Sequence, residues 1–251
     1  MGFQDRVVLI TGGTSGIGKA TSLLFARQGA KVVIAGRREE QGTAVVEEIR
    51  ENGGEAIFVK TDVAQEADVK NLIAAAVQQY GRIDIAFNNA GVDQAGPVTD
   101  FTVDAYRHVF DINVLGVFLS MKYEIEQMLQ QGGGVIINTS SILGHVAMPG
   151  ASIYNASKHA VEGATKTAAL EFAQQNIRIN AVAPAATATD MIDRFAGKPG
   201  AETRSQLAAM HPMNRLATAE EIAAAVAYLA SDAASFTTGI SLPVDGGFLA
   251  K

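Results

Sequence analysis

Short apolar runs alternate with longer amphipathic stretches along the whole chain of 251 residues. The apolar runs have the length of strands and cover residues 7–10, 31–35, 56–59, 83–87, 134–138, 177–182 and 240–242. Helices are predicted between them, over residues 17–28, 44–50, 66–80, 102–131, 154–175 and 219–229. This alternation predicts an α/β fold with a doubly wound, mainly seven-stranded parallel sheet and helices on both faces.

Neither a linker, a repeat nor a low-complexity segment interrupts the alternation, so we predict a single domain over residues 1–251. Residues 190–212 are less patterned and contain Gly197, Pro199 and Gly200. This stretch is typical of a mobile lid over a substrate.

Composition narrows the classes of protein that the chain can belong to. Hydrophobic residues make up 48% and charged residues 18%, which indicates a compact globular protein. The net charge of -6 without a basic patch makes nucleic acid an unexpected partner. Cysteine is absent, which excludes disulfides and thiolate chemistry. The polar first six residues and the lack of a ~20-residue apolar span predict a cytoplasmic protein without membrane contact.

The first strand runs directly into a glycine-rich turn, which residues 17–28 follow as a helix. Gly12, Gly16 and Gly18 mark the turn, and Thr14 and Ser15 lie within it. Backbone N–H groups at such a helix start face an anion, and missing side chains let the anion approach. We therefore predict a dinucleotide site of the Rossmann type, with an ordinary tight turn as the alternative.

The end of the second strand indicates which dinucleotide is bound. Sites that prefer NAD usually place an acidic residue about 20 positions beyond the glycines, to bind the ribose 2′-OH. Gly36, Arg37 and Arg38 occupy that place here, and guanidinium groups suit a 2′-phosphate. NADP(H) is therefore predicted over NAD(H), although the neighbouring Glu39 and Glu40 leave open that both arginines are solvated loop charges.

Three further strand ends carry polar or small residues toward the same edge of the sheet. Asp62 follows the third strand and is a candidate for an adenine contact or for a helix cap. Residues 88–91, Asn-Asn-Ala-Gly, follow the fourth strand and permit close approach of a ligand. Ser140 and Ser141 follow the fifth, where a hydroxyl can donate to a substrate carbonyl. Asn113 stands in an otherwise apolar run, so its amide needs partners.

Tyr154 and Lys158 are four residues apart and share one face of a predicted helix. Neither group exchanges protons at neutral pH by itself, but a cation beside a phenol lowers the pKa of the phenol. The pair is therefore a candidate acid/base unit, and a packed ring beside a solvated charge is the plainer alternative.

These motifs, together with Val-Asp-Gly-Gly at residues 244–247, closely resemble the short-chain dehydrogenase/reductase family in order and spacing over nearly the whole chain. The resemblance implies a catalytic tetrad. In this tetrad Tyr154 is the general acid or base, and Lys158 depresses the pKa of Tyr154 and holds the nicotinamide ribose. Ser141, rather than Ser140, binds the reacting oxygen. Asn113 positions a water molecule that relays protons.

The resemblance also implies which residues bind the cofactor. Asp62 is assigned to adenine, Asn89 to the ribose region and Arg37 to the NADP position. In one departure, Ala185 follows Pro184, where the family commonly has glycine before the contact with the nicotinamide carboxamide. The complete implied set is Gly12, Thr14, Ser15, Gly16, Ile17, Gly18, Arg37, Arg38, Asp62, Val63, Asn89, Ala90, Gly91, Tyr154, Lys158, Pro184, Thr187 and Thr189.

An NADPH-dependent carbonyl reductase, reversible as an alcohol dehydrogenase, is the function that these residues predict. The alternatives are a 3-oxoacyl carrier-protein reductase, a sugar or polyol dehydrogenase, and, from another class, a non-catalytic NADP-binding sensor. The four histidines show no metal-ligand spacing. Apolar faces on residues 102–131 and 154–175 resemble those that form homotetramers in the family. The lid and the loop with His145 and Met148 are expected to line an apolar substrate pocket.

Overall fold

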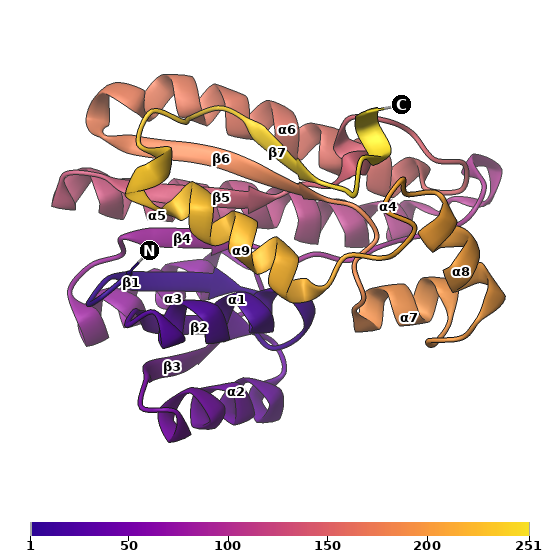
Figure 1. Cartoon of the computed structure of the whole chain (residues 1–251). Coiled ribbons are helices and arrows are strands. Elements are labelled where there is room, and N and C mark those ends of the chain that lie inside the picture. Colours follow the sequence, from indigo (N-terminus) through magenta and orange to yellow (C-terminus); the bar gives the residue numbers. More distant parts are fainter. Residues whose placement is uncertain (1, 251) are drawn as a thin grey trace.

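A computed structural model of the protein describes residues 2–250. Its seven strands form one parallel sheet in the order β3-β2-β1-β4-β5-β6-β7, with helices on both faces (Figure 1). The predicted fold class is therefore confirmed. The strands are β1 (Val7–Thr11), β2 (Lys31–Gly36), β3 (Glu55–Lys60), β4 (Ile85–Asn88), β5 (Gly134–Thr139), β6 (Ile177–Pro184) and β7 (Ser241–Val244).

Two helical layers enclose the sheet. Side chains of α1 (Gly16–Arg27), α2 (Glu39–Glu51) and α9 (Ala219–Ala230) pack on one face. Those of α3 (Glu66–Tyr80), α5 (Gly116–Gln131) and α6 (Ser152–Phe172) pack on the other. Successive residues of a strand point to opposite faces, so strands covered on both sides must be apolar throughout.

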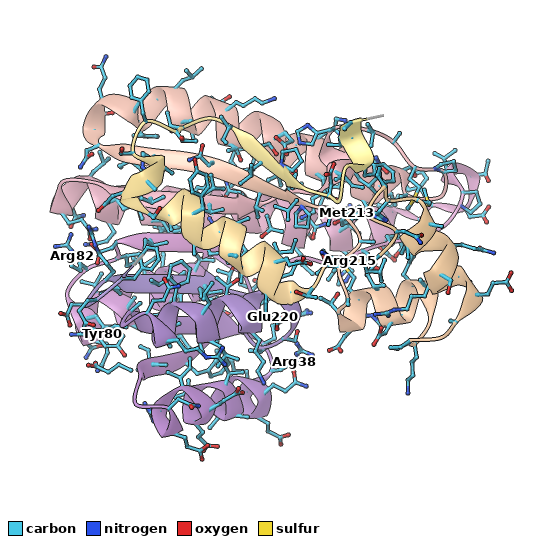
Figure 2. All side chains as sticks on the ribbon, viewed as in Figure 1. Arg38, Tyr80, Arg82, Met213, Arg215 and Glu220 are labelled. Carbon is cyan, nitrogen blue, oxygen red and sulfur yellow. The ribbon has the colours of Figure 1, made fainter. Side chains whose placement is uncertain are left out.

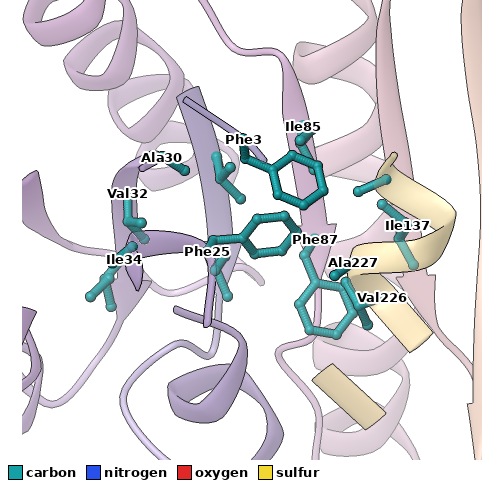
Figure 3. Close-up of a cluster of buried hydrophobic side chains, with 14 of the residues drawn as sticks. Phe3, Phe25, Ala30, Val32, Ile34, Ile85, Phe87, Ile137, Val226 and Ala227 are labelled. Atoms are coloured by element: carbon teal, nitrogen blue, oxygen red, sulfur yellow. The ribbon is translucent and has the colours of Figure 1, made fainter. Parts of the chain in front are cut away.

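The first strand shows this directly. Val8 and Ile10 belong to one buried cluster, and Val7 and Leu9 belong to the other. The aromatic rings of Phe3, Phe25 and Phe87 lie within the first cluster (Figure 3). Within it the rings of Phe3 and Phe25 meet edge to face, with centroids 4.7 Å apart.

Two helical segments differ from their predictions. The stretch predicted as one helix over residues 102–131 consists of α4 (Val103–Phe110), a π-helical turn (Asp111–Leu115) and α5. The predicted lid folds into α7 (Asp190–Ala196) and α8 (Glu202–Ala209), joined by a loop with Gly197 and Gly200 at positive φ. Short helices without a strong apolar stripe leave little periodic signal in the sequence.

Residues 2–250 contain no helix with the length and apolarity that a membrane span needs. In the same range, no group of three His, Asp or Glu side chains is arranged to hold a metal ion. The carboxyl ends of the parallel strands lie at one edge of the sheet, next to α7 and α8 (Figure 1). Ligands of open α/β sheets bind at this edge, so the search for a site begins there.

Candidate active site

A cavity of about 530 Å³ lies along the carboxyl edge of the sheet and extends beneath α7 and α8. It collects most of the residues that the sequence indicated, from strand ends far apart in the chain. Those that line it are Gly12, Thr14, Ser15, Gly16, Ile17, Arg37, Arg38, Asp62, Val63, Asn89, Ala90, Gly91, Ser141, Tyr154, Lys158, Pro184, Thr187 and Thr189. Of the predicted residues, Gly18 and Asn113 lie behind this wall and support it.

The glycine turn fits a phosphate group because side chains are sterically excluded from it. Gly12 and Gly16 have positive φ angles of 66° and 50°. A Cβ atom on Gly18 would lie 2.2 Å from the carbonyl oxygen of Gly12, so the helix start can approach the turn only with glycine there. The N-terminus of α1 thus faces the cavity with backbone N–H groups, which suits the diphosphate of a dinucleotide.

Asn89 fixes the position of this turn from the neighbouring strand. Its side-chain amide donates to the carbonyl oxygens of Thr11 and Gly12, each at 3.2 Å. The Thr11 hydroxyl accepts from the backbone N–H groups of Asn89 and Ala90. These bonds tie the ends of β1 and β4 together, so Asn89 supports the turn from within as well as lining the cavity.

Arg37 and Arg38 follow β2, and both side chains are exposed. Arg38 donates to the hydroxyls of Thr14 at 3.1 Å and Ser15 at 2.7 Å, and so lies over the glycine turn. Arg38, labelled in Figure 2, lines the same cavity as Ile192 and Phe195 of α7. Asp62 accepts from the backbone N–H of Ala64 at 3.1 Å, which closes a turn before α3, and Gln65 rather than Asp62 is the N-cap of that helix.

Tyr154 and Lys158 lie in the first turns of α6, as the spacing predicted. The Lys158 ammonium is 5.6 Å from the centroid of the Tyr154 ring. It donates to the carbonyl oxygen of Thr139 at 2.8 Å, which orients it from the end of β5. The lysine is 4% exposed, so its charge is held in the wall of the cavity rather than in solvent.

The pKa of Tyr154 moves in the direction opposite to that expected from its spacing to Lys158. Burial raises the pKa of Tyr154 to about 12, with a further rise from Asp93, and a hydrogen bond with Ser141 lowers it only in part. Burial also lowers the pKa of Lys158 to about 8, against the opposing charge of Glu162. Without a ligand, Tyr154 is therefore a protonated phenol at neutral pH, which is the form that a proton donor needs.

Ser140 and Ser141 follow β5 and both line the cavity, but their hydroxyls differ in hydrogen bonding. The Ser141 hydroxyl accepts from the backbone N–H of Leu143 at 3.1 Å and interacts with Tyr154. The Ser140 hydroxyl is buried and has no hydrogen-bond partner within residues 2–250. The geometry thus favours Ser141 as the hydroxyl that meets a substrate together with Tyr154.

The side chain of Asn113 is hydrogen-bonded to the backbone of Val92. In the π-helical turn its side chain accepts from the N–H of Val92 and donates to the carbonyl of Val92, both at 2.8 Å. It also donates to the Ser157 hydroxyl at 3.2 Å. The side-chain amide is therefore fully engaged, and it holds the loop at Gly91 and Val92 against α6.

Ala185 has room at the position where the resemblance led us to expect glycine. Residues 2–250 contain three non-glycine residues with positive φ, and Ala185 is not among them. Its methyl group joins a buried cluster with Ile142, Leu143 and Ala151. The departure from glycine therefore fills a small apolar core and does not strain the chain.

The wall of the cavity at its substrate end is mainly apolar, but it contains polar residues that the sequence did not indicate. Met148 lines it as expected, whereas His145 contacts Ser241 and Glu162 instead. Asp93 and His211 also line the cavity. Neither belongs to a motif, and only their position in the folded chain identifies them.

Comparisons with known proteins agree with this geometry. Residues 12–249 match a family model described as "Enoyl-(Acyl carrier protein) reductase". Cyclohexanol dehydrogenase from Acinetobacter sp. (strain SE19) is 42% identical over 99% of this chain and 97% of its own length. The crystal structure of levodione reductase superposes with a TM-score of 0.95 at 37% identity, over 99% of both chains. That of 3-ketoacyl-(acyl-carrier-protein) reductase from Brucella melitensis complexed with NADH gives 0.91 at 33% identity, over 98% and 99%.

Proposed function

Because this chain belongs to the short-chain dehydrogenase/reductase family and is an oxidoreductase of alcohol and carbonyl groups, we propose that it is an NADPH-dependent ketone reductase. In the reverse direction it acts as an alcohol dehydrogenase. The observation that carries the proposal is the cavity in which Tyr154, Ser141 and Lys158 lie beside a glycine turn suited to a diphosphate. When bound, the nicotinamide supplies or accepts the hydride.

Each member of the tetrad has a distinct role in the proposal. Tyr154, protonated at neutral pH, donates its proton to the carbonyl oxygen as a ketone is reduced. Ser141 donates a hydrogen bond to the same oxygen and stabilises the charge that develops on it. Lys158 holds the nicotinamide ribose and supplies positive charge beside Tyr154. Asn113 positions the loop at Gly91 next to Lys158.

Arg38 supports the preference for NADP(H) over NAD(H). Arg38 follows β2, and its guanidinium donates to Thr14 and Ser15 of the glycine turn, so it could hold the ribose 2′-phosphate of a dinucleotide bound there. Arg37 lies next to it along the cavity, and no carboxylate follows β2 at Gly36. A 2′-phosphate would meet two positive charges, whereas a free 2′-OH would find no carboxylate at position 36.

The apolar wall supports a compact, mainly hydrophobic ketone. Met191, Phe195 and Leu207 from α7 and α8 line the same cavity as Tyr154 and Met148. We propose that these two helices act as the lid over the substrate. One relative named above is a cyclohexanol dehydrogenase, which supports a cyclic alcohol or ketone as substrate. The similarity to a 3-ketoacyl-(acyl-carrier-protein) reductase keeps an acyl thioester as the alternative.

The same chain is proposed to assemble as a homotetramer. Large apolar side chains are exposed along α5 and α6, with Phe118 50% and Leu170 84% exposed. Contiguous apolar surface on a monomer marks a protein interface. Light scattering during size-exclusion chromatography tests this, and a monomer at micromolar concentration would contradict it.

The test of the proposed function is loss of reduced-nicotinamide absorbance with NADPH and NADH in parallel. The panel holds cyclic ketones, aryl ketones, a 3-oxoacyl thioester and sugars. Turnover of cyclic ketones with NADPH is expected. Faster turnover of the thioester would favour a 3-oxoacyl carrier-protein reductase, and tight cofactor binding without any turnover would favour a sensor. An NADH preference would overturn the role of the arginines.

A further inference from the structure

His211 places a single imidazole on the substrate side of the cavity. It follows α8, lines the cavity that contains Tyr154, and is 3% exposed. Its ring lies beside Phe248, with centroids 5.4 Å apart. Phe248 and Tyr154 pack against the same buried cluster, so His211 belongs to the wall around the reacting group and not to the cofactor end.

The backbone fixes the tautomer of this ring. Nδ1 is 2.8 Å from the carbonyl oxygen of Leu207, one turn earlier in the chain. A carbonyl oxygen only accepts, so Nδ1 carries the proton and Nε2 of the neutral ring carries a lone pair. The main chain of His211 is held as well, since its N–H donates to Ala208 and its carbonyl accepts from Asn214. The ring therefore presents Nε2 in one defined orientation.

Nε2 is buried and has no hydrogen-bond partner within residues 2–250. A buried acceptor that lacks a donor costs free energy, and each such atom in a folded protein calls for an explanation. The side chain that lies against the ring, Phe248, is apolar and provides no strong donor to Nε2. A hydroxyl group on a bound ligand would satisfy the lone pair.

We propose that Nε2 of His211 accepts a hydrogen bond from a second hydroxyl group of the substrate, remote from the carbon that is oxidised or reduced. The preferred substrates are then cyclic hydroxyketones and the diols formed from them, rather than simple ketones. This inference rests on the proposed function and specifies its substrate class. A site built to bind a hydroxyl discriminates strongly against the analogue that lacks it, because the acceptor is then left unpaired.

The test compares cyclohexanone with 2-, 3- and 4-hydroxycyclohexanone as substrates of the wild-type enzyme with NADPH. For at least one isomer, kcat/KM should exceed that of cyclohexanone by about tenfold or more. In His211→Asn, the asparagine amide can still donate to the Leu207 carbonyl while the Nε2 acceptor is removed. This ratio of hydroxyketone to cyclohexanone kcat/KM should then fall to about one.

His159→Asn is the matched control. His159 lies on α6, is exposed, and makes the same kind of bond from Nδ1 to a carbonyl one turn earlier, that of Asn155 at 2.9 Å. Its ratio should stay at the wild-type value. A wild-type ratio near one for all three isomers would overturn the proposal, and so would an unchanged ratio in a folded His211→Asn enzyme.

A binding measurement separates failure of this inference from failure of the proposed function. Calorimetric titration of NADP⁺-loaded Tyr154→Phe protein with cyclohexane-1,4-diol, cyclohexane-1,3-diol and cyclohexanol measures binding alone, because the active wild-type enzyme would oxidise these alcohols. At least one diol should bind about tenfold more tightly than cyclohexanol, and His211→Asn should abolish the difference. Equal affinities would overturn the role of His211. If all ketones fail as substrates but a diol still binds preferentially, the hydroxyl site stands and the reductase activity is wrong.

Discussion

Replacing Glu124 with glutamine should stabilise the protein. Glu124 lies on α5 with its side chain fully buried below the end of β4. It accepts one hydrogen bond, from the Asn88 amide at 2.9 Å, while its other oxygen and the Asn88 side-chain oxygen have no partner within residues 2–250. Burial raises the pKa of Glu124 to about 8. The folded protein therefore keeps this carboxyl protonated at neutral pH.

The magnitude follows from the difference between the folded and unfolded states. Below pH 4.5, the ordinary pKa of the side chain, Glu124 is protonated in both the folded and the unfolded state. Its ionisation then does not reduce the free energy of unfolding. Between pH 4.5 and about 8 only the unfolded chain releases the proton, so the free energy of unfolding falls as pH rises. Each pH unit costs about 1.4 kcal/mol, which gives about 3 kcal/mol at pH 7.

Glu124→Gln removes this cost and keeps the shape of the side chain. The glutamine oxygen can accept from the Asn88 amide, and its nitrogen can donate to the unpaired Asn88 oxygen. The variant should be about 3 kcal/mol more stable at pH 7 and about as stable as wild type at pH 4.5. A gain of that size raises Tm by about 6–12 °C in a chain of this length.

Urea unfolding followed by circular dichroism, from pH 4.5 to 8 at fixed protein concentration, measures the effect. Glu126→Gln is the matched control because Glu126 is exposed on the same helix, and it should change stability by less than about 0.5 kcal/mol. The reasoning is refuted if Glu124→Gln is less stable than wild type at pH 7. It is also refuted if the two stability profiles run parallel across the pH range.

Three further substitutions test the site. Tyr154→Phe should reduce turnover by at least about 100-fold and leave NADPH affinity nearly unchanged; retention of a tenth of the activity would contradict its role as proton donor. Asp93→Asn should lower the pKa of Tyr154, because the charge of Asp93 raises it. The alkaline limb of the pH profile of kcat/KM for reduction should then move to lower pH. An unmoved limb would show that Asp93 does not influence the pKa of Tyr154. Arg38→Ser should raise KM for NADPH by about tenfold and leave KM for NADH within about twofold. An equal loss with both cofactors would mean that Arg38 serves only to hold Thr14 and Ser15.

Most of the fold was predictable because the strands bury both faces. Such strands appear in the sequence as continuous apolar runs, and each predicted run overlaps an observed strand. Boundaries were less accurate where tertiary bonds decide them. β4 begins at Ile85 and not at residue 83, since the Asp84 side chain accepts from the Val7 N–H at 2.9 Å and from Arg82 at 2.8 Å.

The positions of the site residues were predictable, but their electrostatics were not. The spacing of Tyr154 and Lys158 fixes their shared helix face, because helical geometry is local. The direction of the pKa shift of Tyr154 depends on how deeply the phenol is buried, and burial is set by the whole fold. The same reason explains why Asp93, Glu124 and His211 were missed: each is ordinary in sequence and becomes unusual only when the cavity or the core forms around it.

The most direct test of the central claim is the fate of a deuterium label. Reduction of a cyclic ketone by wild-type enzyme with NADPH deuterated at the transferable position of its nicotinamide should place deuterium on the carbinol carbon of the product. Mass spectrometry and NMR of the product locate the label. Deuterium on that carbon is the result that a hydride-transferring reductase predicts. A reduced product with hydrogen from solvent at that carbon would contradict direct transfer, and the account of this site would be wrong.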